Sequence, residues 1–278
     1  MLREKLGTVV VAAITIMSAL LGIFALSSLV QYYMNAEQTR QDIEEVAEVF
    51  HSNDEQMPET TDTMDPEYLA WLNDKWDEMY ELNNDYAFWL VLDGLDLEYP
   101  VCYSKPDDEY FYLRHDFNGN SNSNGCLYLS PRCTEDSDNF IVYGHRMHSG
   151  NMFGSLGKYQ DEEWALNNRL MQVYLRDEHR FYEVIAVFTV DADNPTVQWE
   201  ALTNFSTASQ SIGYGLQVTN ASDIDFGYTP GTYADRYLTL VTCEYTHSNG
   251  RLIVVARELG TPRLDEIDDT YWEDNEDV

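Results

Sequence analysis

The first hydrophobic pattern along the chain is a long apolar segment near the N-terminus. Residues 6–34 carry no ionisable side chain other than tyrosines, and the core of the segment is VVVAAITIMSALLGIFALSSLV, residues 9–30. As an α-helix this core would measure about 33 Å, against roughly 30 Å of bilayer hydrocarbon. A cleavable signal peptide has a shorter apolar region of about 7–15 residues. The pattern therefore predicts an uncleaved transmembrane signal-anchor at residues 9–30.

The charges on either side of this segment predict its orientation. Arg3 and Lys5 precede it, whereas acidic residues dominate the far flank from Glu37 to Glu45. Cytoplasmic flanks carry an excess of Lys and Arg. Residues 1–8 are therefore expected in the cytoplasm, with the rest of the chain outside a single-pass membrane anchor.

Two helical patterns follow the anchor. In QDIEEVAEVF, residues 41–50, apolar residues recur on one stripe. Asp65 followed by Pro66 is typical of a helix start, and apolar side chains recur at helical spacing after it: Leu69, Leu72, Trp76 and Met79. Residues 31–85 are thus interpreted as an extracellular region of packing helices without a cofactor site.

From residue 86 onward the pattern changes to short apolar runs separated by turn residues. The runs are rich in β-branched and aromatic residues, which is typical of strands. Eight are present: YAFWLVLDG, LEYPVCY, GCLYLS, NFIVYGH, MQVYLR, RFYEVIAVFTV, RYLTLVTCEY and RLIVVARE. Eight strands in about 170 residues predict a mainly β domain at residues 86–262, either a closed barrel or a sandwich.

Two helical segments and an acidic tail complete the pattern. DEEWALNNRL begins at Asp161, a suitable helix cap, and TASQSIGYGL lies in the long polar excursion between Val190 and Tyr237. Residues 264–278 contain eight acidic and no basic side chains. A solvated acidic tail is therefore expected at residues 263–278.

Composition restricts the classes of partner. Asp and Glu number 49 against 16 Lys and Arg, for a formal net charge of −33. Nucleic acid and anionic lipid headgroups are excluded as charge-driven partners, because phosphate binding requires clustered cations. Aromatic residues make up 13% of the chain, which indicates a folded domain with an acidic surface.

The chain contains four cysteines: Cys102, Cys126, Cys133 and Cys243. The expected location outside the membrane permits disulfides. Cys126 and Cys133 are close enough in sequence to pair, although spacing alone does not establish connectivity. Cys102 is interpreted as a strand residue in the core, without a chemical role.

Cys243 is the candidate nucleophile because of the strand pair in which it lies. RYLTLVTC and RLIVVAR, joined by EYTHSNG, predict an antiparallel hairpin. Its geometry brings Cys243 beside Arg251 at one rim of the sheet. Arg257, six residues further on, would lie about 20 Å away, so it is interpreted as an edge or surface charge.

A thiol nucleophile requires an acid–base partner, and the chain has six histidines: His51, His115, His145, His148, His179 and His247. His51 and His179 lie in polar linker or turn sequence, His115 is compatible with a surface position, and His247 lies in a Ser/Asn/Gly turn. His145 ends the apolar strand NFIVYGH, after a glycine that permits a tight exit, and His148 follows in the loop. A strand end is a rigid position at a barrel rim, which favours His145.

The chain resembles the class B sortases, from the anchor to the last strand. NFIVYGHRMHSGNMFGSLGKY resembles the histidine block of that family, TLVTCEY its cysteine block and GRLIVVARE its arginine strand. LDGLDLEYPVCY and DDEYFYLRHDFNGNSNSNGCLYL are similar to its early strands in order and spacing. One departure is Val241, where class B members commonly carry Ser, which affects any contact made by that hydroxyl but not the nucleophile.

The resemblance implies the eight-stranded sortase barrel with flanking helices, and catalytic residues His145, Cys243 and Arg251. It also implies a membrane-anchored cysteine transpeptidase of Gram-positive bacteria. Such an enzyme cleaves a C-terminal sorting signal of surface proteins through a thioacyl-enzyme. The product is then transferred to an amine of the cell wall, in peptidoglycan, or to a pilin lysine.

Two other classes of function remain compatible with the residues. One is a membrane-anchored binding or adhesion module with an inert Cys243, and the other is a cysteine endopeptidase. No cofactor or metal is expected, because the acidic clusters PDDEY and DEEW are interpreted as a turn and a helix start. Substrate-binding residues are not assigned from the sequence.

Overall fold

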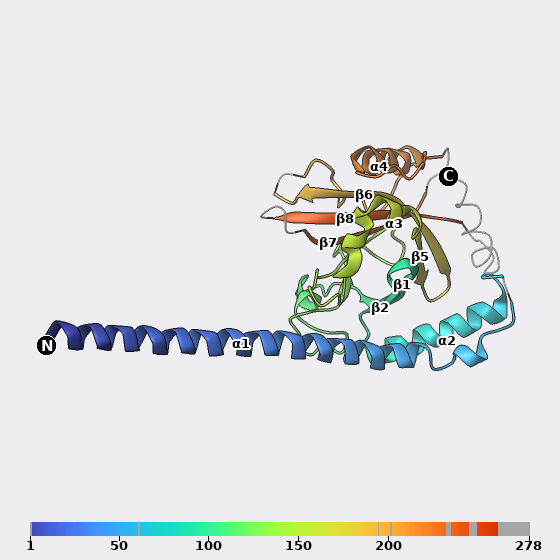
Figure 1. The fold of residues 1–278 in the computed structure, drawn as a ribbon. Helices are drawn as coiled ribbons and strands as arrows, with labels where there is room; N and C mark the ends of the chain where they lie inside the picture. The colour runs from blue at the N-terminus through green and yellow to red at the C-terminus, as the bar shows by residue number, and fades with distance from the viewer. Residues whose placement is uncertain are drawn as a thin grey trace.

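The computed structural model describes residues 2–60, 62–193, 195–200, 202–231, 235–244 and 249–260. For residues 2–10 and Glu244 it describes the backbone but not the side chains. Their central feature is a closed barrel of eight strands (Figure 1). Around the barrel the strands follow the order β1 (Tyr86–Leu92), β2 (Leu97–Cys102), β3 (Leu127–Leu129), β4 (Asn139–Tyr143), β7 (Tyr237–Glu244), β8 (Gly250–Glu258), β6 (His179–Asp191) and β5 (Leu170–Tyr174). The sequence prediction of a closed eight-stranded barrel is confirmed, and the sandwich alternative is wrong.

Two strand pairs are parallel and therefore determine how distant segments meet. β2 lies parallel to β3 and β4 parallel to β7, while the other neighbouring pairs are antiparallel. Parallel strands cannot be joined by a tight hairpin. The β4–β7 connection accordingly spans β5, β6 and the long excursion before Tyr237, and the barrel closes only when this whole segment is in place.

The helices surround the barrel on its outside (Figure 1). They are α1 (Leu2–Phe50), α2 (Pro66–Leu82), α3 (Glu162–Leu166) and α4 (Ala208–Ala221), with short 3₁₀ turns η1 (Asp54–Gln56), η2 (Asp93–Leu95), η3 (Phe111–Leu113) and η4 (Ser155–Gln160). The Asp65 and Asp161 side chains accept hydrogen bonds from the first turns of α2 and α3, as expected of caps. Thr207 does the same at α4.

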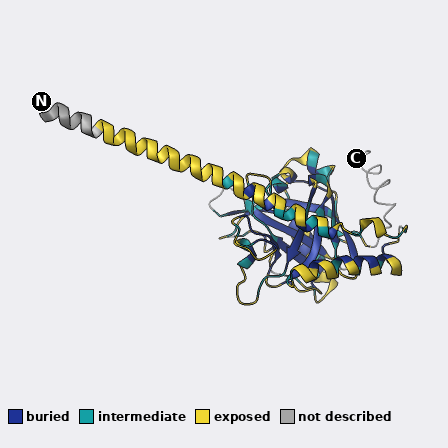
Figure 2. Ribbon diagram, turned by 90° about the horizontal axis from the view of Figure 1, so that it is seen from below, coloured by how far each residue is buried: buried dark blue, intermediate teal, exposed yellow. Residues whose placement is uncertain are grey.

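The anchor and the first helical pattern form one helix rather than two. α1 runs without interruption through residues 9–30 and 41–50. No Gly or Pro lies between Val30 and Phe50, so no residue in that stretch ends or kinks the helix. Figure 2 shows α1 extending away from the barrel, and its residues 11–30 are all exposed. This helix is long and apolar enough to cross a membrane.

A buried lysine joins α1 to α2. Lys75 of α2 is 1% exposed; its Nζ donates to the Phe50 carbonyl at the end of α1 and contacts the Asp54 carboxylate. The same ammonium lies 4.5 Å from the centroid of the Phe50 ring and 4.7 Å from that of Trp71. A cation at a helix C-terminus is favourable, so Lys75 stabilises both the helix end and the turn after it.

His179 attaches α2 to the barrel, in contrast to the polar turn position expected from the sequence. It is the first residue of β6 and is 6% exposed. The Tyr68 hydroxyl lies 2.7 Å from its Nδ1, and its Nε2 lies 3.1 Å from the Gln172 side-chain oxygen. Since the amide oxygen can only accept, Nε2 donates to it and Nδ1 accepts from Tyr68. Burial lowers the pKa of His179 from 6.5 to about 3, so the imidazole is neutral in the fold.

The chain is expected to lose stability in mild acid partly through His179. An unfolded histidine takes up a proton near pH 6.5, but the folded one does so only near pH 3. Its contribution to stability is therefore present above pH 6.5 and decreases as the pH falls, by up to about 1.4 kcal/mol per pH unit. Urea unfolding of wild type and His179→Gln between pH 7 and pH 4 checks this. The difference between the two unfolding free energies should shrink toward pH 4, and a constant difference would contradict the assignment.

Candidate active site

The β7–β8 hairpin places Cys243 beside Arg251. The two residues are direct register partners in the antiparallel ladder, and Val190 of β6 faces Arg251 from the other side. Both side chains are partly exposed, and Arg251 Nη1 donates to the Gly250 carbonyl at 3.0 Å. The register predicted from the sequence is confirmed. A thiol and a guanidinium thus lie at the same rim of the barrel.

Arg257 lies at the opposite end of β8, where it pairs in register with Tyr237. Its interpretation as an edge charge is wrong, and as a surface charge it is only partly exposed. β8 has β6 on one side and β7 on the other, and the Arg257 side chain is 29% exposed. Its Nη2 lies 3.0 Å from the Glu183 carboxylate of β6. The sequence did not reveal this partner because Glu183 is remote in the chain.

His145 lies just beyond the end of β4, next to the end of β7. The last parallel register pair is Tyr143 with Val241, and the Gly144 amide continues the ladder to the Val241 carbonyl at 3.2 Å. The Thr242 hydroxyl donates to the Gly144 carbonyl at 2.8 Å. His145 and Cys243 come one residue later, at the ends of these two neighbouring strand segments. The strand exit therefore brings the backbone of His145 to the rim that holds Cys243 and Arg251.

The glycine before His145 is required by packing. A Cβ at Gly144 would lie 2.4 Å from the Leu127 side chain and 2.7 Å from the Phe153 ring. Neither contact is compatible with normal van der Waals radii, so a larger residue would displace the strand exit. The tight exit inferred from the sequence thus corresponds to a crowded backbone position.

A backbone carbonyl orients the His145 ring. Nε2 of His145 lies 2.9 Å from the Leu113 carbonyl oxygen. Because a carbonyl can only accept, Nε2 carries the proton and Nδ1 is left as the basic nitrogen of the neutral ring. Leu113 ends η3, whose Tyr112 hydroxyl donates to the Asp85 carboxylate at 2.7 Å. The Cys126 amide also donates to the Tyr112 carbonyl at 2.9 Å, so η3 is fixed at both its side chain and its backbone.

Two tyrosines that the sequence did not single out form one wall of the rim. Tyr128 of β3 and Tyr143 of β4 are register partners, with ring centroids 5.7 Å apart. Burial raises the pKa of Tyr128 to about 12; among nearby charged groups, Cys243 raises this pKa slightly and Arg251 lowers it slightly. The Tyr128 hydroxyl is therefore within electrostatic reach of both. The Tyr143 hydroxyl donates to the Glu200 carboxylate in the excursion between β6 and β7.

The other described histidines lie elsewhere. His51 is between the Asp54 and Glu98 carboxylates, at 2.6 and 2.8 Å, and the His115 ring stacks on Phe111 at 3.9 Å. His148 is exposed in the loop after His145. His247 lies outside the described residues, as does the expected acidic tail.

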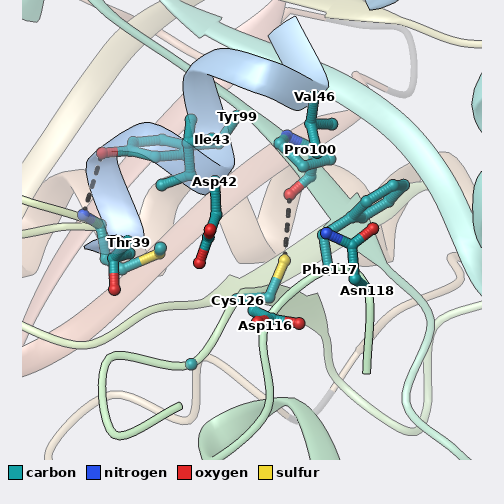
Figure 3. Close-up of a pocket in the computed structure, with 12 residues that line it drawn as sticks. Thr39, Asp42, Ile43, Val46, Tyr99, Pro100, Asp116, Phe117, Asn118 and Cys126 are labelled. Carbon is teal, nitrogen blue, oxygen red and sulfur yellow. Dashed lines mark hydrogen bonds between the residues drawn. The ribbon is translucent and has the colours of Figure 1, made fainter. Parts of the chain in front are cut away.

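The possible Cys126–Cys133 pair is not formed, and the two thiols point into different clusters. Cys126 Sγ lies 3.6 Å from the Pro100 carbonyl and Cys133 Sγ lies 3.5 Å from the Asn139 carbonyl. Figure 3 shows Cys126 lining a small pocket of about 20 Å³ between α1 and the barrel. The lining residues of that pocket include none of the three predicted catalytic residues.

Metal-ligating residues do not gather at the described part of the rim. Within the part of the chain that the structure describes, no group of three or more His, Cys, Asp or Glu side chains is arranged to hold a metal ion. The acidic run at residues 161–163 caps and begins α3, as interpreted from the sequence.

The described site consists of a register pair of Cys243 and Arg251 at one rim of a closed β-barrel, with His145 at the adjacent strand exit. The sortase domain family model matches residues 92–259. The chain belongs to the sortase family, and its relatives and structural neighbours identify it as a class B cysteine transpeptidase.

Three similar proteins support this assignment. Sortase B of Listeria monocytogenes is 26% identical over 187 residues, which cover 66% of this chain and 73% of that protein. The X-ray structure of Clostridium perfringens sortase B is 28% identical, with a TM-score of 0.60, over 66% of this chain and 98% of that one. The Staphylococcus aureus sortase B–substrate complex, 21% identical with a TM-score of 0.67, shares the fold over 81% and 98% of the two chains.

Proposed function

We propose that this class B sortase is anchored in the membrane by α1 and acts through Cys243, His145 and Arg251. It cleaves a C-terminal sorting signal and transfers the product to an amine of the cell wall or to a pilin lysine. The observation that carries the proposal is the register pairing of Cys243 with Arg251, with His145 at the adjacent strand exit.

Each proposed residue has a separate chemical task. The Cys243 thiolate attacks the carbonyl carbon of the scissile peptide, forming the S–C bond of a thioacyl-enzyme as the C–N bond breaks. His145 gives a proton to the leaving amine and later takes one from the incoming amine. Attack by that amine forms the new C–N bond and releases the Cys243 thiolate. Arg251 stabilises the negative oxygen in both steps.

The hydrogen bond to Leu113 supports the role of His145. A general acid must keep its ring orientation through two proton transfers in opposite directions. The Leu113 carbonyl holds Nε2, so Nδ1 is the nitrogen that exchanges the proton with substrate. The two-point attachment of η3 keeps that carbonyl in place.

The anchoring part of the proposal rests on the apolar helix and its flanks. α1 could span a bilayer, and the basic residues before residue 9 and the acidic residues after residue 36 favour a cytoplasmic N-terminus. Residues 1–8 are then cytoplasmic and residues 9–30 span the membrane. Residues 31–85 form the extracellular helical region, residues 86–262 the catalytic barrel and residues 263–278 the acidic tail.

A product analysis tests the function. The full-length chain in detergent is incubated with a panel of sorting-signal peptides and candidate amines: oligoglycine, a peptidoglycan stem peptide and a pilin-like lysine peptide. Mass spectrometry should detect an amide-linked product with one acceptor class. Hydrolysis alone with every amine would indicate an endopeptidase. Absence of both products, together with a Cys243 that resists electrophilic thiol probes, would indicate a binding module.

Arg251→Lys is expected to reduce turnover about 10²–10³-fold, the usual cost of losing an oxyanion donor. A guanidinium presents donors in a planar fork, and an ammonium cannot reproduce two aligned bonds to one oxygen. Arg257→Lys is the matched control, because a lysine there keeps a charge beside Glu183 at the opposite end of the same strand. Steady-state kinetics on both variants, with melting curves to verify folding, measure the effect. Equal losses at the two positions would contradict the role of Arg251.

A further inference from the structure

An acidic side chain lies beside the proposed site, on the excursion between β6 and β7. The Glu200 carboxylate accepts a hydrogen bond through Oε1 from the Tyr143 hydroxyl at the end of β4. Glu200 is exposed, and within the described part of the chain no Lys or Arg side chain forms an ion pair with it. A carboxylate that is oriented at one oxygen and open to solvent can bind a cation supplied by another molecule.

The backbone around this carboxylate is fixed on both sides. The Glu200 carbonyl accepts from Arg132 Nη1 at 3.0 Å, and the Thr203 hydroxyl donates to the Arg132 carbonyl at 3.2 Å. The preceding side chain, Trp199, is 6% exposed. The excursion is irregular at this point, but its contacts give Glu200 a defined position. Loop residues that a rigid scaffold positions in this way often carry binding functions.

Strand register places the carboxylate on the same face of the sheet as the thiol. Tyr143 pairs with Val241 of β7, and register partners project from the same face. Cys243 is two residues beyond Val241, so its side chain projects from that face as well. Tyr143 and Cys243 are then separated by one strand spacing, about 4.8 Å, and by two residues, about 7 Å, along the strands. Two or three residues of an extended peptide cover that distance.

Tyr128 gives a second, electrostatic indication. Its ring centroid lies 5.7 Å from that of Tyr143. Burial raises the pKa of Tyr128 to about 12; Cys243 and Glu200 each raise it slightly, and Arg251 lowers it slightly. One hydroxyl is thus within electrostatic reach of the thiol, the guanidinium and the carboxylate. Glu200 therefore belongs to the surroundings of a peptide bound at the rim.

We propose that Glu200 is a specificity-determining residue, which selects sorting signals that carry a lysine or arginine within three residues before the scissile bond. This inference rests on the proposed function and adds a substrate preference to it. The Tyr143 hydroxyl holds one carboxylate oxygen, and the other oxygen binds the ammonium or guanidinium. A signal with a neutral side chain at that position leaves the carboxylate without this partner, and a signal with an acidic one is repelled.

The attacking amine is not the cation in question. That amine must be neutral to attack, and a carboxylate that bound it would favour its protonated form. The amine also has to reach His145 at the strand exit, whereas Tyr143 lies two residues earlier on β4, further from the rim. The group beside Glu200 therefore belongs to the acyl segment of the signal, which stays bound through both steps.

The first test varies the peptide and keeps the acceptor uncharged. Full-length enzyme in detergent is given peptides with lysine, norleucine or glutamate at each of the three positions before the scissile bond. Hydroxylamine, which is uncharged at pH 7, is the acceptor. At one of these positions kcat/KM for the lysine peptide should exceed that for the norleucine peptide about fivefold, the upper range for an exposed ion pair. Added salt should reduce this ratio.

Charge variants show whether the preference comes from Glu200. Glu200→Gln should bring the lysine-to-norleucine ratio to about one, and Glu200→Lys should invert the order, so that the glutamate peptide becomes the best of the three. Glu163→Gln removes an exposed carboxylate from α3. It is the matched control for net charge and should keep the wild-type ratio. A purely structural role of Glu200 would change turnover of all peptides alike and could not produce the inversion.

The outcomes separate the inference from the proposed function. Ratios of one at all three positions in wild type, or a ratio that Glu200→Gln leaves unchanged, would overturn the inference. A second series compares glycinamide with lysinamide as the acceptor. A preference for lysinamide that depends on Glu200, without any preference among the peptides, would place the cation on the acceptor and also overturn it. Failure of wild type to cleave any peptide would instead contradict the proposed function.

Discussion

Cys243→Ala is expected to abolish both cleavage of the sorting signal and transfer to the amine. Alanine has no nucleophilic atom, and no other described thiol lies at the rim: Cys102, Cys126 and Cys133 are all buried in the core. Without the thiolate no thioacyl-enzyme forms, so the loss should reach the detection limit rather than a partial value. Mass spectrometry of the reaction products measures both activities in one assay.

Cys102→Ala and Cys133→Ala are the matched controls for this prediction. Each removes a thiol from the barrel without changing charge, and each thiol is buried, at 0% and 7% exposure. Burial raises the pKa of both thiols above its usual value, so neither supplies a reactive thiolate. These variants should keep turnover while melting at a lower temperature. Substantial turnover by Cys243→Ala would refute the proposed nucleophile.

His145→Ala is expected to reduce turnover by about 10²–10⁴-fold, the range typical of a lost general acid–base. The variant leaves Cys243 and Arg251 in register, so peptide binding should persist while proton delivery to the leaving amine is lost. Turnover with saturating peptide, compared with peptide affinity, separates the two effects. The expected result is a large fall in kcat with little change in binding.

His148→Ala is the control for His145→Ala. His148 is three positions further along and exposed in the loop after the strand exit, so its loss should change the turnover of soluble peptide only mildly. A severe effect of His148→Ala combined with a mild effect of His145→Ala would show that the strand exit does not position the acid.

The strands and the hairpin register could be predicted because they depend on local information. Alternating and β-branched runs mark each strand, and counting back from the loop EYTHSNG brings Cys243 opposite Arg251. The same counting places Arg257 at the far end of the strand. Both positions follow from one turn, without knowledge of the rest of the chain.

The support of the site could not be predicted, because it depends on contacts between remote segments. The acceptor for His145 is the backbone carbonyl of Leu113, 32 residues away, and every residue type carries such a carbonyl. The partner of Arg257 is Glu183, 74 residues away. Barrel closure determines both contacts. The continuity of α1, in contrast, could have been predicted, because no Gly or Pro lies between Val30 and Phe50.

The parallel pairing of β4 with β7 has a consequence for when the enzyme becomes competent. The Thr242–Gly144 contact joins residues 98 apart in the chain, and such non-local pairing forms late because a long loop must close first. Cys243 and His145 therefore stay apart until β7 has paired with β4. Before that pairing the thiol and its acid lie on separate segments, so activity begins only once the last two strands have entered the barrel.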